Sequence, residues 1–367
     1  MGLNKIRLGD YIIRSTQNNR DLKYGVELIS GVTSQGVFAI PKGDPIDVNL
    51  KPYKIVNNGA FVYNPTRLDL GSIAYRTDGL CIVSHLYMVF YLTEEGKRII
   101  DPTWLYIYFR RNEFLREVTF RNFGSQRPEF NFEDMSDIII PLPDLPTQQK
   151  YVDIYNAMVA NQQAYERGLE DLKTVFTSYI EELRRNDPVF PIGDYITLYN
   201  EKNGDGAIAL EQGININKEF ISPQRSNSNL QGRKIVRHGQ FAYCTQLNNA
   251  NVAIAYRSGE DCVVSSVYNV FEITQKDKLI PEYLLMWLIR PEFGRYVYCA
   301  SEGSAYEFLN YNNLANYKIP IPNIEVQRAI SEIYMAYNKR KKINEQLKTQ
   351  IKNICPVLIR GSLEEGR

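Results

Sequence analysis

The longest regular pattern of hydrophobic residues lies between residues 144 and 187. Steps of four, three, four, three and four residues separate Tyr165, Leu169, Leu172, Phe176, Tyr179 and Leu183. This heptad spacing is typical of a helix that packs along another helix. No proline lies between Pro146 and Pro188, so the pattern predicts one long helix that ends before Pro188.

A similar but less regular stripe occupies residues 323–360. Its members are Ile330, Ile333, Tyr337, Ile343, Leu347, Ile354 and Val357. The basic run 338–342 interrupts the stripe, and we expect Pro356 to limit the helix. Two such helices, each of about 39 residues and roughly 58 Å, are expected to pack on each other, most easily antiparallel.

Shorter periodic segments precede each predicted helix. β-branched and aromatic runs bounded by Gly, Asn, Asp and Pro predict strands at 36–40, 60–64, 72–76 and 81–92. A passage with helical spacing follows at 102–118, and a matching one at 281–297. Each half of the chain is therefore expected to begin with a compact α/β unit.

The two halves are copies of one another. A shift of 179 residues aligns Ile140–Gln149, "IPLPDLPTQQ", with Ile319–Arg328, "IPIPNIEVQR". Upstream, Ile73–Phe90 aligns with Ile254–Phe271 at a shift of 181. The drift between these shifts places the gaps in the first part of each half, so the chain is a tandem duplication that has diverged mainly in loops.

The repeated Pro-x-Pro segment marks the junction between unit and helix in each half. We expect it to be an extended linker. Asp144 and Asn323 occupy equivalent positions, and each can accept hydrogen bonds from the first turn of the helix that follows. Gln148 and Gln327 then fall in that first turn.

The expected fold is α+β (mixed α/β), with two similar α/β domains separated by two long antiparallel coiled-coil helices in a pseudo-twofold arrangement. The predicted boundaries are 1–143 for the first domain, 144–187 for the first helix, 188–322 for the second domain, 323–360 for the second helix and 361–367 for a C-terminal tail. Such a layout suits a bipartite target whose two parts are held at a set distance.

Composition narrows the class of protein. Lys and Arg total 43 against 42 Asp and Glu, so a nucleic-acid surface must be a local patch. The five cysteines form no CxxC pair, which favours reduced, structural thiols and no zinc site. No segment has the length and apolar character of a signal core or a membrane span, so a cytoplasmic location is expected.

The doubled junction with its following Gln and long helix, together with the repeated "GDYI" at Gly9–Ile12 and Gly193–Ile196, resembles the specificity (S) subunit of type I restriction-modification enzymes. The resemblance spans Gly2 to Arg360. It implies two target-recognition domains that each read half of a split double-stranded DNA sequence, and helices that act as spacer and docking surface. It also implies two methylation subunits that bind S-adenosylmethionine and restriction (motor-nuclease) subunits that use ATP and magnesium, so this chain itself would bind no cofactor.

The sequence contains no complete enzyme motif that would favour a different interpretation. The chain contains no phosphate loop of the G-x-x-x-x-G-K-[ST] type, and Asn64–Arg67 has only a fragment of a methyltransferase motif. The two histidines, His85 and His238, lack repeated counterparts and metal-ligand spacing. A protein-binding scaffold and a stand-alone DNA-modifying enzyme with an unrecognised active site are the alternatives.

Candidate DNA contacts are Arg, Lys and amide side chains on loops that differ between the halves, because Arg pairs with guanine and Asn or Gln with adenine. In the first domain they are Gln35, Lys54, Asn64, Arg67, Arg76, Arg121, Ser125, Gln126 and Arg127. In the second they are Gln224, Arg225, Arg233, Lys234, Arg237, Gln246, Asn248, Asn249, Arg257, Ser304 and Tyr306. The matched pair Arg76 and Arg257 is expected to contact phosphate or support the fold before reading a base.

Overall fold

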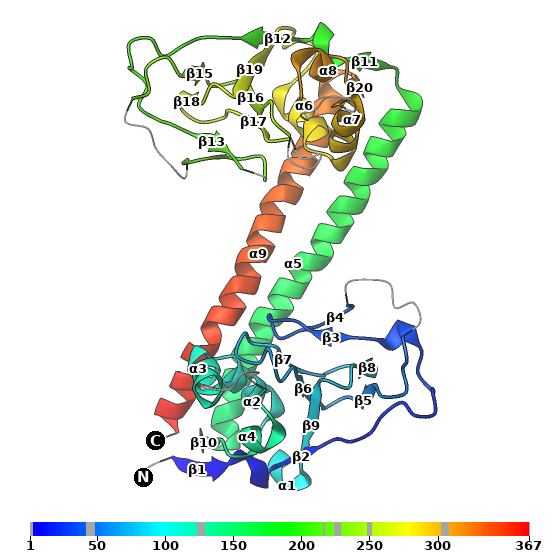
Figure 1. Cartoon of the computed structure of the whole chain (residues 1–367), viewed down its shortest axis with the longest axis vertical. Coiled ribbons are helices and arrows are strands. Elements are labelled where there is room, and N and C mark those ends of the chain that lie inside the picture. The colour runs from blue at the N-terminus through cyan, green and yellow to red at the C-terminus, as the bar shows by residue number, and fades with distance from the viewer. Residues whose placement is uncertain are drawn as a thin grey trace. The chain divides into compact units, whose positions relative to one another are not determined.

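The chain folds into two compact units, which a computed structural model describes for residues 3–41, 48–122, 129–215, 217–223, 229–247, 252–301 and 308–366. The first unit comprises residues 1–165 and 343–367, and the second comprises residues 166–342. Each contains one α/β head and a part of both long helices, α5 (Leu145–Asn186) and α9 (Ile324–Glu365) (Figure 1). The mixed class predicted above is confirmed.

The first head contains short strands followed by short helices. Its strands are β1 (Asn4–Arg7), β2 (Ile12–Arg14), β3 (Gly31–Val32), β4 (Phe38–Ala39), β5 (Lys54–Val56), β6 (Phe61–Tyr63), β7 (Ile73–Tyr75), β8 (Cys81–Val83), β9 (Met88–Leu92) and β10 (Ile139–Leu142). Its α-helices are α1 (Glu94–Lys97), α2 (Pro102–Phe109), α3 (Asn112–Arg121) and α4 (Phe132–Ser136), and its 3-10 turns are η1 (Leu8–Asp10) and η2 (Val26–Leu28).

The second head repeats this order, except that η2 and α1 have no counterparts among its described residues. Its strands are β11 (Val189–Pro191), β12 (Ile196–Tyr199), β13 (Gly213–Ile214), β14 (Phe220–Ile221), β15 (Lys234–Val236), β16 (Phe241–Cys244), β17 (Ile254–Tyr256), β18 (Cys262–Val264), β19 (Tyr268–Ile273) and β20 (Lys318–Pro320). Its helices are η3 (Ile192–Asp194), α6 (Pro281–Leu288), α7 (Pro291–Ser301) and α8 (Tyr311–Ala315).

The sheets of the two heads have the same topology. The four-stranded sheet runs β2-β9-β6-β7 in the first head and β12-β19-β16-β17 in the second, and each head adds three matching two-stranded sheets. Registers also correspond, since Phe61 pairs with Phe90 across β6 and β9, and Phe241 pairs with Phe271 across β16 and β19. The duplication is therefore a duplication of structure.

Each head has a large aromatic core on the helical side of its four-stranded sheet. The rings of Phe61 and Phe90 stack with centroids 5.0 Å apart, and those of Phe241 and Phe271 with centroids 4.9 Å apart. A smaller aliphatic cluster fills the opposite side in both heads. The sheet is thus covered on two faces, which leaves the turns at the strand ends for other contacts.

The first proline of each Pro-x-Pro junction lies in a paired strand, which corrects the expectation of an extended linker for that part of the junction. Pro141 lies in β10, which pairs antiparallel with β1, and Pro320 lies in β20, which pairs with β11. A proline is tolerated there because each sheet has only two strands, so one edge of the strand needs no hydrogen bonds. The pairing ties the first strand of each head to its last one.

The predicted helix caps are confirmed. The Asp144 carboxylate accepts a hydrogen bond from the Thr147 amide at 3.0 Å, and the Asn323 side chain accepts one from the Val326 amide at 3.0 Å. Both long helices therefore begin where the repeated junction predicts.

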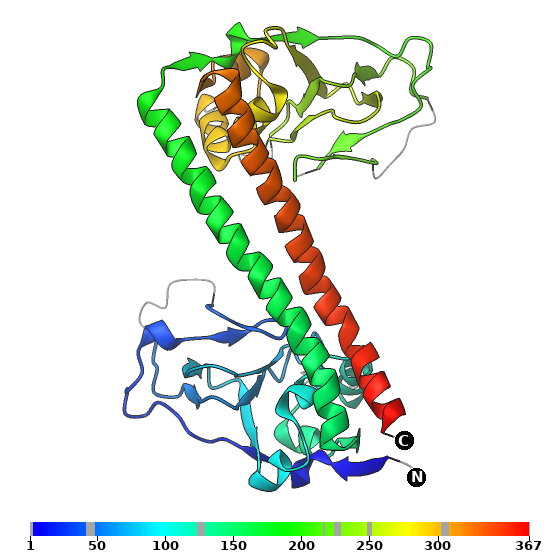
Figure 2. The same ribbon diagram turned by 180° about the vertical axis from the view of Figure 1, so that it is seen from behind.

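In each unit, α5 and α9 lie side by side and run in opposite directions (Figures 1 and 2). In the first unit Gln162 donates to the Asn344 side chain at 2.9 Å, and earlier on α5 Lys150 pairs with Glu365 at 2.7 Å. In the second unit the rings of Phe176 and Tyr334 lie 5.1 Å apart. The predicted coiled-coil contact of the two helices is confirmed.

Most of the predicted heptad positions face inward. Buried or half-buried side chains are those of Tyr165, Leu169, Leu172, Phe176, Leu183, Ile330, Ile333, Tyr337, Ile343, Leu347 and Ile354. Tyr179 is 47% exposed, whereas Ile180 is fully buried. At this end of α5 the helix packs against the core of the second head, which Ile180 and Leu183 both enter.

Helix α9 does not end at Pro356, so that expectation is wrong. The proline lies inside the helix, which continues through most of the predicted tail to Glu365. Leu358 and Ile359 are buried in the core of the first head, and Ser362 accepts a hydrogen bond from the Trp104 indole at 3.0 Å. This packing offsets the loss of one helical hydrogen bond at the proline.

Candidate nucleic-acid interface

Three loop segments meet at one end of the first head. They are residues 33–37 between β3 and β4, 64–72 between β6 and β7, and 129–131 before α4, and together we call them the first loop cluster. The Ser72 hydroxyl donates to the Val32 carbonyl at 2.9 Å, and the Phe130 amide donates to the Pro65 carbonyl at 3.0 Å. Segments that are far apart in sequence thus form a single surface.

The second head has the corresponding second loop cluster, made of residue 215 with 217–219, residues 245–247 with 252–253, and residues 308–310. The Leu309 amide donates to the Thr245 carbonyl at 2.8 Å, and Gln246 forms a β-bridge with Phe308. Ala253 packs with Ile214 and Phe220 in the small cluster of this head. The same three connections therefore come together in both heads.

Three of the predicted contact residues are exposed on these clusters. They are Gln35 and Arg67 in the first head and Gln246 in the second. Asn64 also lies there, but its side-chain oxygen accepts hydrogen bonds from the amide and hydroxyl of Thr66, at 3.1 and 2.9 Å. Asn64 therefore shapes its own loop, while the other three side chains extend toward solvent.

Lys54 and Lys234 hold equivalent positions and serve the fold of each head. Lys54 donates to the Tyr87 carbonyl at 2.5 Å, and Lys234 donates to the Tyr268 carbonyl at 2.6 Å. Partial burial lowers the pKa of both ammonium groups. Each lysine fastens the strand before the central hairpin to the turn that follows β8 or β18.

Arg76 and Arg257 form a second matched pair. The guanidinium of Arg76 lies 5.1 Å from the ring centre of Phe38, and that of Arg257 lies 5.2 Å from the ring centre of Phe220. Arg257 also donates to the Glu260 carbonyl and to the Gln212 side chain. These cation–π contacts attach the hairpin β3–β4 or β13–β14 to the rest of the head.

The other described arginine candidates are paired with carboxylates. Arg237 bridges Glu201 and Asp261, and the hydrogen bonds to Glu201 and then Asp261 raise the pKa of its guanidinium. Arg233 lies 3.4 Å from Glu211. Arg121, the last residue of α3, pairs with Glu117 at 2.9 Å. A phosphate would have to compete with these partners.

Nine of the predicted contact residues fall outside the described part of the chain. They are Ser125, Gln126, Arg127, Gln224, Arg225, Asn248, Asn249, Ser304 and Tyr306. For seven of the nine, all except Gln224 and Arg225, the described residues that flank the segment, such as Phe130 and Leu309, belong to the loop clusters. The candidates in these segments remain predictions.

Sequence reasoning missed Asn217, which holds the place of Gln35 at the tip of the second head. The hairpin turns have the same bonds, because Thr33 accepts from Gly36 and Asn215 accepts from Lys218, each through the backbone at 3.0 Å. Asn217 is exposed. Aligning "GVTSQGVFA" with "GININKEFI" at a shift of 182 would have found it.

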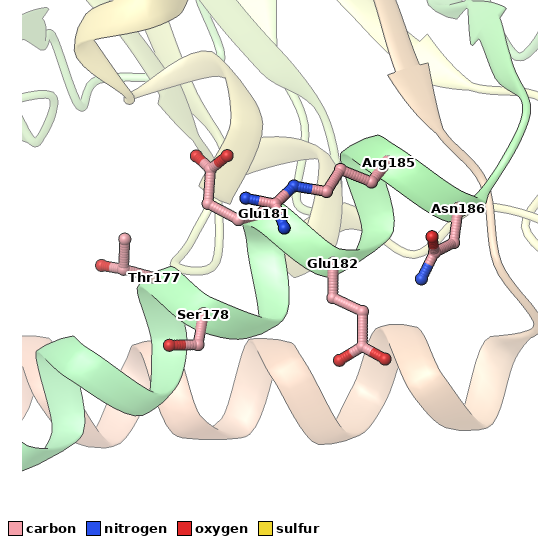
Figure 3. Close-up of a pocket in the computed structure, with 6 residues that line it drawn as sticks. All are labelled: Thr177, Ser178, Glu181, Glu182, Arg185 and Asn186. Carbon is pink, nitrogen blue, oxygen red and sulfur yellow. The ribbon is translucent and has the colours of Figure 1, made fainter.

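A surface hollow of about 490 Å³ lies along the last turns of α5 (Figure 3). It is lined by Thr177, Ser178, Glu181, Glu182, Arg185 and Asn186. All six residues come from one helix and are exposed. The hollow therefore lacks the converging buried polar groups of a ligand or catalytic site.

Titratable groups in the described residues do not assemble into a metal site. Within those residues there is no cluster of three or more His, Cys, Asp and Glu side chains that could hold a metal ion. Burial raises the pKa of the Cys262 and Cys355 thiols to about 11, so they stay protonated. Across the same residues, no helix is long and apolar enough to cross a bilayer.

Two heads of one topology, each with a polar loop cluster and joined to a shared pair of long helices, define a duplicated recognition protein. Comparison with known families identifies the family of this recognition protein. The family model of the type I restriction modification DNA specificity domain matches the chain twice, at residues 9–173 and 181–353. The chain belongs to this family, and it is a DNA specificity subunit of a type I restriction-modification system.

One solved structure supports the fold, and two others are similar over most of their length. The S subunit of the type I system from M. genitalium is similar over 99% of this chain and 96% of its own, with a TM-score of 0.60 and 10% identity. The HsdS subunit from Thermoanaerobacter tengcongensis matches over 99% and 96%, with a TM-score of 0.41 and 16% identity. A structure of type I system assembly and conformational transition matches over 99% and 97%, with a TM-score of 0.48 and 16% identity. No curated protein sequence matched the chain.

Proposed function

We propose that this chain reads a split double-stranded DNA sequence, with one head on each half-site, and contributes no active site of its own. The carrying observation is that the family domain occurs twice, and that the two copies present the same loop cluster. Two similar reading surfaces in one chain suit two half-sites, as in dimeric DNA-binding proteins. The recognition domains would be residues 1–143 and 188–322.

The loop clusters are the proposed reading surfaces. Gln35, Asn217 and Gln246 carry exposed amides of the kind that pair with adenine, and Arg67 carries a guanidinium suited to guanine or phosphate. Most other described candidates already have protein partners, so we assign them to support of the surface.

The long helices would hold the two heads and dock the partners. By membership of a type I system, we infer two methylation subunits and restriction subunits, with S-adenosylmethionine, ATP and magnesium bound by those partners. The assembly would act in the cytoplasm, where the DNA is.

Sequencing of methylated adenines tests the proposal. Cells that express this chain with the methylation subunits of its system should show methylation at one split motif, and deletion of the chain should abolish it. Absence of such a motif would sink the proposal.

Two measurements address the alternative functions. A duplex carrying the motif should bind with an affinity that falls as salt rises, because phosphate contacts release counterions; a protein-only scaffold would show no such binding. Methylation or cleavage by the purified chain alone would instead indicate an active site within it.

A further inference from the structure

The turns that carry Gln35 and Asn217 share an unusual backbone conformation. The residue after each tip has a positive φ, +76° at Gly36 and +64° at Lys218. Glycine adopts this region freely, whereas a lysine there is strained. The first head has the favoured glycine at this position, whereas the second head has a lysine. We therefore expect a contact of the lysine side chain to offset the backbone strain.

In the first head the space beside Gly36 is occupied by Arg110. A Cβ atom on Gly36 would lie 2.6 Å from Nη1 of Arg110, and one on Gly71 would lie 3.0 Å from the same atom. Arg110 is only 5% exposed, and its guanidinium donates to the carbonyls of Gly71 and Ser34. It thus joins two segments of the first loop cluster from below.

Arg110 is the residue that follows α2, and it carries its charge without a carboxylate partner among the described residues. The free carbonyls at a helix C-terminus have partial negative charge and favour a cation. The carbonyls of Ser34 and Gly71 add to this, so the space beneath this turn offers acceptors for the hydrogen bonds of one positive group.

In the second head the cation comes from the hairpin turn and not from the end of the helix. Ile289 follows α6 at the position of Arg110, and Val252 stands in place of Gly71. The half-buried Lys218 extends from the turn, and its ammonium lies 3.4 Å from the carbonyl of Leu288, the last residue of α6. The glycine and arginine of one head are thus exchanged for a lysine and an isoleucine in the other.

We propose that the cation beneath the hairpin turn is a positioning element of each reading head, supplied by Arg110 in the first and by Lys218 in the second. It fixes the turn so that the neighbouring tip amide, Gln35 or Asn217, meets its base. This inference rests on the proposed function, because it assigns the turns to half-site reading. It also makes Gly36 with Arg110, and Lys218 with Ile289, interchangeable pairs.

The test exchanges the pairs within the full chain, assembled with the methylation subunits of its system. Arg110→Ile should reduce discrimination at one half-site by about tenfold, the loss expected for one charge-assisted contact, and leave the other half-site unchanged. Lys218→Gly should reduce discrimination at the other half-site and leave the first one unchanged. The double variant Gly36→Lys with Arg110→Ile should regain most of the discrimination. Duplexes carry the mapped split motif with single base changes in either half.

Hydrogen exchange of the free assembly provides a readout without DNA. The amide of Gly36 should exchange faster in Arg110→Ile and return toward the wild-type rate in the double variant. If Arg110→Ile fails to fold, Tyr106→Phe takes its place, since it removes only the hydroxyl that donates to the Gly36 carbonyl at 3.0 Å; it should weaken the same half-site.

Equal loss at both half-sites, or a double variant no better than Arg110→Ile, would overturn the inference. A wild-type assembly that reads no split motif would overturn the proposed function alone, because the exchange measurement uses no DNA. The two failures are therefore distinguishable.

Discussion

Two buried glutamines fasten the heads to the long helices. The Gln148 side chain accepts from the Asp101 amide and donates to the carbonyls of Ile99 and Pro143, all at 2.8 Å. Gln327 makes the same three contacts in the second unit, with Ile280, Lys278 and Pro322. A glutamine is needed because only a primary amide of this length can accept one bond and donate two.

Replacing this glutamine should destabilise the first unit strongly. Gln148→Leu leaves one amide and two carbonyls buried without partners, so the free energy of unfolding should fall by about 2–4 kcal/mol. Urea unfolding followed by circular dichroism measures the change. The exposed neighbour provides the control: Gln149→Leu should cost less than about 0.5 kcal/mol. Equal effects of the two changes would contradict the assigned role of Gln148.

Lys218 should make the stability of the second unit depend on pH. Burial lowers the pKa of its ammonium to about 8, from the ordinary value near 10.5. Between these values the unfolded chain binds more protons than the folded one, so the free energy of unfolding should rise with pH through this window. The rise is complete above pH 10.5 and absent below pH 8.

Urea unfolding at pH 8, 9 and 10 tests this dependence by comparing the wild type with Lys218→Met and Lys218→Arg. Neither replacement side chain titrates in the window, so both variants should lack the contribution. An unchanged pH dependence in both would show that Lys218 titrates in the folded state as it does in the unfolded chain.

Roles of single residues were predicted only where the repeat itself identified them. The caps Asp144 and Asn323 follow from their place before a helix, but nothing local shows that Arg237 would be held by Glu201 and Asp261. Those partners lie far along the chain, and the fold alone brings them together. For this reason the residue types of a DNA contact were recognisable from sequence, whereas their availability was not.

At the scale of elements, hydrophobic spacing predicted both long helices well and their ends less well. The heptad count selected Tyr179, but a straight helix drifts relative to a seven-residue repeat, and near the second head Ile180 faces the core instead. Pro356 was expected to end α9 on local grounds. Burial of Leu358 and Ile359 overrides that preference, and such tertiary contacts are invisible in a local pattern.

The helix pair contains a buried polar contact where its pattern of apolar residues is interrupted. Gln162 and Asn344 are 8% and 3% exposed and bond to each other at 2.9 Å. A polar pair in a helical seam penalises other registers, in which its members would face apolar groups. We expect this pair to select the register of α5 on α9 at a cost in stability.

Leucine substitutions of Gln162 and Asn344, singly and together, should separate the hydrogen bond between them from the cost of burying two polar side chains. Gln162→Leu or Asn344→Leu alone breaks this buried hydrogen bond and should lower the free energy of unfolding by about 1–3 kcal/mol. The double leucine variant should recover that loss, because two apolar groups replace two polar ones. Chemical unfolding measures all three, with the exposed Gln163→Leu as control. Additive losses in the double variant would contradict a direct pairing.

At the scale of the whole molecule, the repeat was the most informative feature of the sequence. It predicted two heads and two helices without any knowledge of their strands, and the strand order then proved identical in both. The divergent loops could not be predicted in the same way. Aligning the two halves identifies equivalent residues only where their sequences are still similar.

The same duplication leads to the last prediction, that helix length sets the distance between half-sites. Residues 170–173 of α5 and 336–339 of α9 lie between the contacts of Gly168 with Arg340 and of Phe176 with Tyr334, so they face one another in the second unit. Deleting both segments removes about one turn, roughly 6 Å, from each helix. The spacer of the methylated motif should shorten by about one or two base pairs, since base pairs stack about 3.4 Å apart, while both half-sites stay the same.

Deleting only 170–173 shifts one helix against the other and should abolish methylation. An unchanged spacer in the paired deletion would refute a measuring role for the helices.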